Sequence, residues 1–368
     1  MVTAMGWRQN YARSTAAVCG NLAAFSSSAS RMKAKTLLLT LLFAFFATVR
    51  AEPVTFTLDA PQAREVFLAG EMTDWDAHKR PMARGADGVW RLQLDLAPGQ
   101  WLYKFVVDGR WVHDPATPDH DADGQGGQHS FVFVGEGAWT PPATGRGRVE
   151  THEVPSAAFG RSDKVNVYLP PGFERGQALP VLTLLHGGGM DADQWFRTGH
   201  IERYADHLIA SGRIRPMVIV MPSNNGQRYD GAAGRFIVDE LPAWLKARYG
   251  LTASRAQSAV AGMSLGGYGS VKLPLAAPGR WGYAYAIAGW YPPELIAEVK
   301  RAGKMPVKLV LRCGTEDDLL AGNRALLATL TAQGRKIDYR EDRGAHTFHY
   351  WSQLTAEMLE GADAYFRR

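Results

Sequence analysis

The 368-residue chain has little cysteine and lacks the usual motifs of metal and cofactor chemistry. Its two cysteines are Cys19 and Cys313. Cys19 lies in an N-terminal segment that we expect to be removed, so the mature chain should contain no intrachain disulfide. Paired cysteines, an H-E-x-x-H zinc motif, a phosphate-binding glycine loop and internal repeats are all absent. We therefore predict a protein that needs no metal and no cofactor.

The chain also has no excess of basic charge when residues 1–51 are left out of the count. The whole chain has a net charge of +5, but residues 1–51 hold six basic residues and no acidic residue. Residues 52–368 therefore carry 35 basic and 36 acidic side chains, a net charge of −1. This balance gives no reason to expect binding to nucleic acid.

No apolar run reaches the length of a typical membrane span. The longest candidate, residues 36–49, follows a short basic region that begins at Met32 and is followed by Arg50 and Ala51. This order is typical of a secretory signal peptide. We expect an N-terminal extension and signal peptide over residues 1–51, with Met32 as an alternative start. Cleavage near Ala51 would give a periplasmic or secreted protein, and an uncleaved anchor is the alternative.

The most informative motif is Gly262-Met263-Ser264-Leu265-Gly266, which follows a short apolar segment. The pattern G-x-S-x-G after a strand predicts the nucleophile elbow of an α/β-hydrolase. Small residues two before and two after the serine relieve crowding of the backbone in this sharp turn, which lifts the serine Oγ clear of the sheet. We expect Ser264 to be the nucleophile. A simple turn is the alternative interpretation of the motif on its own.

Two later segments supply an acid and a base in the chain order of an α/β-hydrolase triad. Asp317 follows an expected strand, residues 307–313, at the edge of the sheet where such sites form. His346 follows another expected strand, residues 336–341, and precedes an expected helix at 351–365. We predict Asp317 as the acid and His346 as the base. The alternatives are Asp318 or Glu316 for the acid and His349 for the base.

Backbone donors for an oxyanion are predicted from His186-Gly187-Gly188-Gly189, which follows an apolar strand at 181–185. Glycines let the backbone approach a developing oxyanion closely. We place the two donors at the N–H groups of Leu265 and Gly188, with Gly187 as the alternative. Aromatic residues near this end of the sheet are candidates for substrate binding, with loop packing as the alternative: Trp195, Trp290, Tyr291 and Trp351.

Together these motifs resemble the superfamily of esterase D, feruloyl esterase and enterochelin esterase. The resemblance covers residues 147–368 and includes the opening strand 165–173, the glycine loop and the segments around the three candidate triad residues. It implies an α/β-hydrolase with a mostly parallel sheet and helices on both faces. It also implies a triad of Ser264, Asp317 and His346, but it names no substrate.

Residues 52–135 show short alternating runs separated by turn signals such as Asp87-Gly88 and Asp108-Gly109. This pattern predicts an immunoglobulin-like antiparallel β-sandwich. A Pro- and Gly-rich segment at residues 136–146 is expected to link it to the hydrolase domain, residues 147–368.

Two segments of this first domain, residues 66–75 and 101–115, resemble the glycogen-binding module of the AMP-activated protein kinase β-subunit. The resemblance implies that Trp75, Lys104 and Trp111 line a glycan site. Indole faces stack on sugar rings, and a lysine can fix hydroxyl groups. Packing of the tryptophans over the sandwich core is the alternative that the pattern alone leaves open.

Several features limit the ligands of this domain. Ser130 stands where the family has an asparagine, so one amide contact to a glycan would be missing. Residues 52–140 hold seven basic and 14 acidic residues, which favours a neutral polysaccharide such as an α-glucan over an acidic one. Asp119 to Gly124 copy the start of an EF-hand loop, but its last ligand position falls on Ser130. We therefore expect no calcium site.

These features predict a secreted serine carboxylic-ester hydrolase that acts on a carbohydrate-linked ester, feruloyl or acetyl. A periplasmic siderophore esterase of the enterochelin type is the second hypothesis, because those enzymes also carry a β-domain before the hydrolase. A glycan-binding protein with a non-catalytic hydrolase scaffold is the third. Sequence does not separate a hydrolase from an acyltransferase. The expected partners are the ester substrate and a polysaccharide at the β-domain, without nucleic acid and without a stable membrane anchor.

Overall fold

The computed structural model describes residues 51–117, 120–122 and 127–368, and these belong to one compact unit. The expected signal peptide lies outside the described residues, as do Asp119 and Asp123 of the EF-hand-like motif. No helix in the described ranges is long and apolar enough to cross a membrane.

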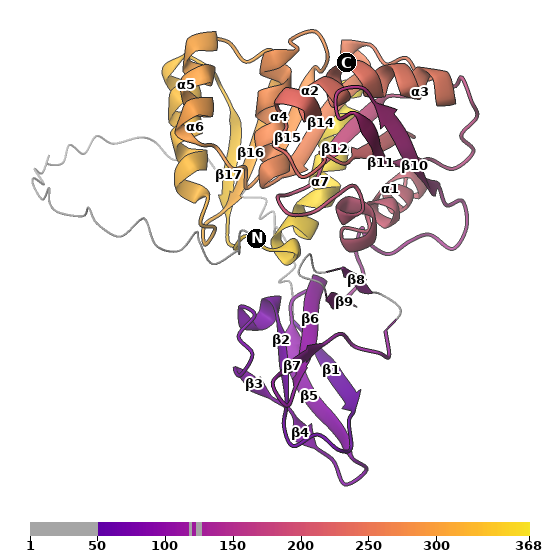
Figure 1. Ribbon diagram of the computed structural model, residues 1–368, viewed down its shortest axis with the longest axis vertical. Coiled ribbons are helices and arrows are strands. Elements are labelled where there is room, and N and C mark those ends of the chain that lie inside the picture. The colour runs from indigo at the N-terminus through magenta and orange to yellow at the C-terminus, as the bar shows by residue number, and fades with distance from the viewer. Residues whose placement is uncertain (1–50, 118–119, 123–126) are drawn as a thin grey trace, which may run out of the picture. The chain divides into compact units, whose positions relative to one another are not determined.

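The N-terminal part, residues 52–134, is called the β-domain below and consists of antiparallel strands in two sheets (Figure 1). One sheet has the strand order β1-β5-β4, and the other has the order β3-β2-β6-β9-β8 with β7 paired to β6. The strands of the first sheet are β1 (Glu52–Asp59), β4 (Ala83–Arg84) and β5 (Val89–Leu96). Those of the second are β2 (Val66–Gly70), β3 (Arg80–Pro81), β6 (Gly99–Val107), β7 (Arg110–Val112), β8 (His120–Ala122) and β9 (Gln128–Val134).

The core of the β-domain follows from the alternation of side chains along its strands. In β1, Phe56 and Leu58 are buried, whereas Thr55 and Thr57 between and beside them are exposed. Phe56 meets Tyr103 of β6 edge to face, with ring centroids 4.9 Å apart. The two sheets therefore share one apolar core.

The C-terminal part has an α/β-hydrolase fold built on an eight-stranded sheet of order β10-β11-β13-β12-β14-β15-β16-β17. β10 and β11 are antiparallel to each other, β11 is antiparallel to β13, and the strands from β13 to β17 are parallel. The strands are β10 (Arg148–Ser156), β11 (Arg161–Leu169), β12 (Val181–Leu185), β13 (Val218–Pro222), β14 (Ser258–Met263), β15 (Tyr283–Ile287), β16 (Lys308–Gly314) and β17 (Asp338–Asp342).

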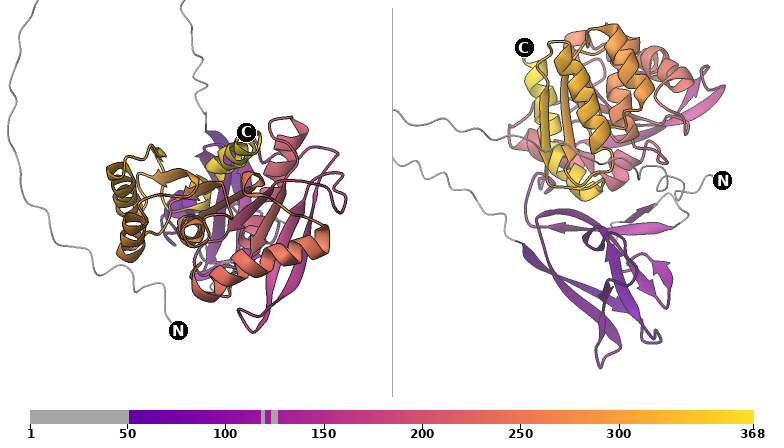
Figure 2. Two further views of the ribbon diagram at one scale, coloured as in Figure 1. Left: turned by 90° about the horizontal axis from the view of Figure 1, so that it is seen from above. Right: turned by 90° about the vertical axis from the view of Figure 1, so that its left-hand side faces the viewer.

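Helices lie against both faces of this sheet (Figure 2). In β14, Ala259 and Ala261 pack toward α1 and α7, whereas Val260 packs toward α3 to α6, so the strand is buried on both faces. The helices are α1 (Ile201–Ala210), α2 (Gly231–Arg235), α3 (Leu241–Tyr249), α4 (Leu265–Ala276), α5 (Pro293–Ala302), α6 (Leu320–Ala332) and α7 (Phe348–Phe366). Shorter helical turns are η2 (Glu71–Thr73), η3 (Gln194–Thr198), η4 (Phe236–Glu240) and η5 (Arg255–Gln257).

Cys313 lies fully buried near the end of β16. Burial raises the pKa of its thiol to about 12, and the nearby Asp317 carboxylate acts in the same direction. The carboxyl ends of β12, β14, β16 and β17 lead into the loops that hold the predicted site residues. These four strands therefore bring distant parts of the chain to one edge of the sheet.

Candidate active site

Ser264 occupies a sharp turn between β14 and α4. Its backbone torsions are φ 55° and ψ −117°, a conformation that residues other than glycine rarely adopt. The Ser264 N–H donates to the Ile287 carbonyl of the neighbouring strand β15 over 2.9 Å. The strand, the helix and this hydrogen bond together hold the strained conformation in place.

The two glycines of the motif are required by close backbone approaches. A Cβ on Gly262 would lie 2.7 Å from the Leu185 carbonyl oxygen and from backbone atoms of Gly266. A Cβ on Gly266 would lie 2.2 Å from the Leu185 carbonyl oxygen. Because these neighbours are backbone atoms, they cannot move aside as a flexible side chain would. The glycines therefore let α4 start directly against the end of β12.

The structure brings Ser264, His346 and Asp317 into one hydrogen-bonded chain. His346 Nδ1 lies 2.8 Å from Asp317 Oδ2, and His346 Nε2 lies 3.0 Å from Ser264 Oγ. A carboxylate can only accept, so Nδ1 carries the proton and Nε2 is free to accept from the serine hydroxyl. The Asp317 side chain is fully buried, whereas the His346 side chain is 32% exposed. The Asp317 carboxylate thus fixes the orientation of the imidazole through Nδ1, while the rest of the ring stays accessible to a substrate.

The alternative triad residues lie elsewhere. Asp318 is exposed, and Glu316 forms an ion pair of 3.2 Å with Arg343 on the surface. His349 lies in the first turn of α7, which begins three residues earlier than predicted because Thr347 caps it by accepting from the Tyr350 N–H. His349 Nδ1 is bonded to the Gln100 carbonyl oxygen, away from Ser264.

The two candidate N–H donors in the glycine loop after β12 have different surroundings. The Gly187 N–H donates to Gln194 Oε1 over 2.7 Å, so this donor is already occupied. A Cβ on Gly188 would lie 3.9 Å from Leu265 Cβ, so these two residues are neighbours. Leu265 is the first residue of α4, and the N–H of a first helical residue has no acceptor within the helix. This arrangement favours Gly188 over Gly187.

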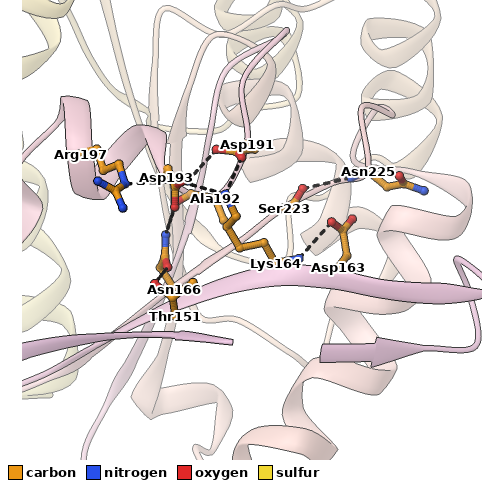
Figure 3. Close-up of polar contacts among 10 residues, drawn as sticks. All are labelled: Thr151, Asp163, Lys164, Asn166, Asp191, Ala192, Asp193, Arg197, Ser223 and Asn225. Carbon is orange, nitrogen blue, oxygen red and sulfur yellow. Dashed lines mark hydrogen bonds and ion pairs between the residues drawn. The ribbon is translucent and has the colours of Figure 1, made fainter. Parts of the chain in front are cut away.

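Polar side chains of β11 contact residues 191–193, the segment that follows the glycine loop in the chain (Figure 3). Lys164 Nζ of β11 contacts Asp191 at 2.9 Å and Asp193 at 2.8 Å. Asn166 of the same strand donates to Asp193 over 2.7 Å and to the Ala192 carbonyl over 3.0 Å. Burial alone would raise the pKa of Asp193, but the bonds from Lys164 and Asn166 hold it below its ordinary value. The cluster ends directly before Gln194, which carries the Gly187 contact.

A cavity of about 920 Å³ lies over Ser264 and His346. The hydrolase part contributes Gly187, Gly188, Met190, Gln194, Thr347, Phe348 and Trp351 to its lining. The β-domain contributes Glu71, Trp75, Leu102, Lys104, Trp111, His113, Gln128 and His129. All three residues predicted to bind glycan therefore line the same cavity as Ser264. Sequence reasoning missed Glu71 and Gln194, for which no motif or spacing gave a signal.

The two tryptophans of the β-domain are held side by side, with ring centroids 6.5 Å apart. Trp111 is 45% exposed, which is unusual for so large an apolar side chain. Asp74 and Trp75 both have positive φ, 56° and 57°, and the Trp75 N–H donates to the Gly70 carbonyl. Ser130 is fully buried and accepts from the Asp114 N–H, so its hydroxyl is engaged within the domain.

The predicted substrate-binding tryptophans divide into three cases. Trp351 lines the cavity and meets the His346 ring edge to face at 4.9 Å. Trp195 fits the alternative of packing instead, because this side chain is 1% exposed and its indole N–H donates to the Leu185 carbonyl in the core. Trp290 is also absent from the described cavity lining and packs on Tyr268 instead, with centroids 5.5 Å apart. Neither of these two side chains therefore lines the cavity over Ser264.

Comparisons with known proteins agree with this division of the chain. Residues 156–361 match the family described as putative esterase, and residues 52–139 match the glycogen recognition site of AMP-activated protein kinase. An endo-1,4-beta-xylanase/feruloyl esterase of Xylanibacter ruminicola is 26% identical over 335 residues, 83% of this chain and 44% of that protein. The AMP-activated protein kinase subunit beta-1 of Sus scrofa is 38% identical over 72 residues, 20% of this chain and 56% of that protein.

The chain thus spans about half the length of the curated relatives it matches. Among solved structures, the enterobactin esterase of Shigella flexneri superposes with a TM-score of 0.67 at 19% identity, covering 86% of this chain and 94% of that one. That likeness extends the shared fold across both parts of the chain. The chain belongs to the esterase family of α/β-hydrolases and carries at its N-terminus a domain of the glycogen-recognition type found in AMP-activated protein kinase.

Proposed function

We propose that this protein is a serine carboxylic-ester hydrolase with Ser264 as nucleophile, His346 as base and Asp317 as the acid of the triad. The observation that carries the proposal is the hydrogen-bonded chain from Asp317 through His346 to Ser264 at the floor of a cavity. Membership of the esterase family supports the same conclusion.

The reaction proceeds in two acyl-transfer steps. Ser264 Oγ attacks the ester carbonyl while His346 Nε2 takes the hydroxyl proton, and Asp317 keeps Nδ1 protonated. The N–H groups of Leu265 and Gly188 stabilise the oxyanion, and losing one such donor typically costs about 3 kcal/mol of transition-state stabilisation. His346 returns the proton to the departing alcohol. Water, activated by the same imidazole, then releases the acid and restores Ser264.

The substrate we propose is a carbohydrate-linked ester, with a feruloyl or acetyl group as the acyl part. Trp75 and Trp111 line the cavity beside Ser264, and paired indole faces suit stacking on sugar rings. Lys104 lines the same wall and is able to bind sugar hydroxyls. The xylanase/feruloyl esterase that resembles most of this chain supports the feruloyl choice.

We further propose that the β-domain is an immunoglobulin-like sandwich that binds a neutral polysaccharide. Its net charge, with seven basic against 14 acidic residues over 52–140, disfavours an acidic one. The composition of residues 1–51 supports secretion or a periplasmic location.

The test is release of ferulate from feruloylated arabinoxylan oligosaccharides by the purified protein, with Ser264→Ala as the control. Ferulate release that is lost in Ser264→Ala while the variant still folds is the expected result. Hydrolysis of a small activated acetate ester tests the triad separately from the proposed carbohydrate-linked substrate. Hydrolysis of the acetate ester without ferulate release would keep the triad and redirect the search to acetylated glycans or siderophore esters. Hydrolysis by Ser264→Ala at the wild-type rate would refute the assignment of the nucleophile.

A further inference from the structure

Glu71 of the β-domain contacts the start of the helix that follows the catalytic histidine. Glu71 Oε1 accepts from the His349 N–H over 3.0 Å, in the first turn of α7. The Phe348 N–H also donates to this carboxyl group. The other oxygen, Oε2, accepts from the Leu102 N–H of β6 over 2.9 Å. One side chain thus bridges the β-domain backbone and the N-terminus of α7.

The first N–H groups of a helix have no acceptor within the helix, and acidic side chains stabilise this end. At the start of α7, the Thr347 side chain accepts from the Tyr350 N–H over 3.3 Å, and the Thr347 carbonyl accepts from the Trp351 N–H over 3.1 Å. The N–H groups of Phe348 and His349 depend instead on Glu71, which lies 278 positions away from His349 in the chain. The first turn of α7 is therefore capped from outside its own domain.

Neighbouring contacts fix the same turn from further directions. The His349 ring stacks on Trp101 at a centroid distance of 3.5 Å, and its Nδ1 lies 3.0 Å from the Gln100 carbonyl oxygen. Leu102 and Phe131 of the β-domain join the apolar cluster that includes α7. The β-domain thus contacts this turn through hydrogen bonds, ring stacking and apolar packing.

We propose that Glu71 is a positioning residue for His346, acting through the first turn of α7. The proposal rests on the role assigned to His346 above. Phe348 lies two residues after His346, and Trp351 of the same helix meets the His346 ring at 4.9 Å. A shift of this turn would therefore move the imidazole relative to Ser264 Oγ, now 3.0 Å away.

The environment of Glu71 supports a functional reason for its presence. Burial raises the pKa of Glu71 to about 7, even though three backbone N–H groups favour its charged form. A carboxyl group whose pKa is raised in the folded state lowers stability as the pH rises above its ordinary pKa. Residues that lower stability are found preferentially where activity requires them.

The test compares Glu71→Gln with Glu65→Gln, a matched change at an exposed glutamate of the same domain. Glutamine keeps the volume but offers one acceptor oxygen instead of two, so it cannot serve both Leu102 and α7. With a small activated acetate ester, we expect kcat of Glu71→Gln to fall roughly tenfold to a hundredfold, since small misplacements of catalytic groups have such effects. KM should change less than twofold, and Glu65→Gln should match the wild type.

Hydrogen exchange provides a second readout. Amides in the segment 346–352 should exchange faster in Glu71→Gln, whereas those of β14 should not change. Glu71→Asp, which keeps the charge but is one methylene shorter, should show an intermediate kcat. A kcat within twofold of wild type in both variants would overturn the inference while leaving Ser264-dependent hydrolysis intact. Equal activity in Ser264→Ala and the wild type would instead refute the proposed function itself.

Discussion

Replacement of Gly266 by alanine should damage both the fold and the activity, against the direction that helix propensity alone predicts. Gly266 lies in the first turn of α4, where alanine is favoured over glycine by about 1 kcal/mol. The added Cβ, however, would lie 2.2 Å from the Leu185 carbonyl oxygen and 2.9 Å from that of His186. Ordinary contacts begin near 3.4 Å, so α4 and the end of β12 would have to separate by about 1 Å.

Overpacking of this kind costs about 3 kcal/mol when only backbone can yield, which leaves a net loss of about 2 kcal/mol after the gain in propensity. For a protein of this size that corresponds to a melting temperature lower by roughly 4 °C. The separation would also displace the Gly188 N–H relative to Ser264. A displacement of about 1 Å in an active site lowers kcat by about a hundredfold.

Gly234 of α2 provides the matched control, because a Cβ there would meet its nearest atom, Leu273 Cδ2 of α4, only at 3.8 Å. Gly234→Ala should raise stability by about 0.5–1 kcal/mol and leave kcat unchanged. Both variants would be measured by thermal unfolding and by hydrolysis of a small activated acetate ester. A Gly266→Ala protein with wild-type kcat and melting temperature would refute the close approach of α4 to β12.

Two further predictions concern charged groups. Lys164→Met should remove the ion pairs that this lysine forms with Asp191 and Asp193, lowering the free energy of unfolding by about 1–2 kcal/mol and kcat several-fold. Lys300→Met on the exposed side of α5 should change neither quantity. Equal denaturation curves and rates for the two variants would contradict the proposed support of the glycine loop. The pKa of Glu71 is raised from 4.5 to about 7 in the folded state. Between these two pH values, the folded state therefore binds a proton that the unfolded state has lost. Stability should therefore fall as pH rises from about 5 to 7.5, by at most about 3 kcal/mol from this group, and Glu71→Gln should lose this slope. Parallel curves of unfolding free energy against pH for the two proteins would exclude the shift.

The sequence carried much of the information on family and fold because its signals are local. The glycine pattern around Ser264 predicted the α/β-hydrolase fold, and the alternating runs after residue 52 predicted a β-rich domain before it. The comparisons confirm both the esterase family and the glycogen-recognition-type domain. The proximity of Ser264, Asp317 and His346 could be anticipated because parallel strands place their following loops at one edge of the sheet.

Other features could not be predicted because they depend on tertiary contacts without a sequence pattern. Trp195 was expected near a substrate, but its indole N–H meets a carbonyl of β12 in the core, and an aromatic residue in a loop carries no sign of its direction. The contact of Glu71 with α7 joins residues of two domains, and no periodicity marks it. The expectation of a signal peptide concerns residues outside the described ranges and stays a prediction.

Cys313 has a practical consequence for work on this protein. Within residues 52–368 it is the single cysteine, it is fully buried, and its thiol pKa is about 12. The nucleophilic form of cysteine is the thiolate, so maleimides and mild oxidants should not react with Cys313 while the fold is intact. Labelling of this thiol would then report unfolded molecules alone, and a cysteine introduced on the surface could carry a dye without competition from the native one.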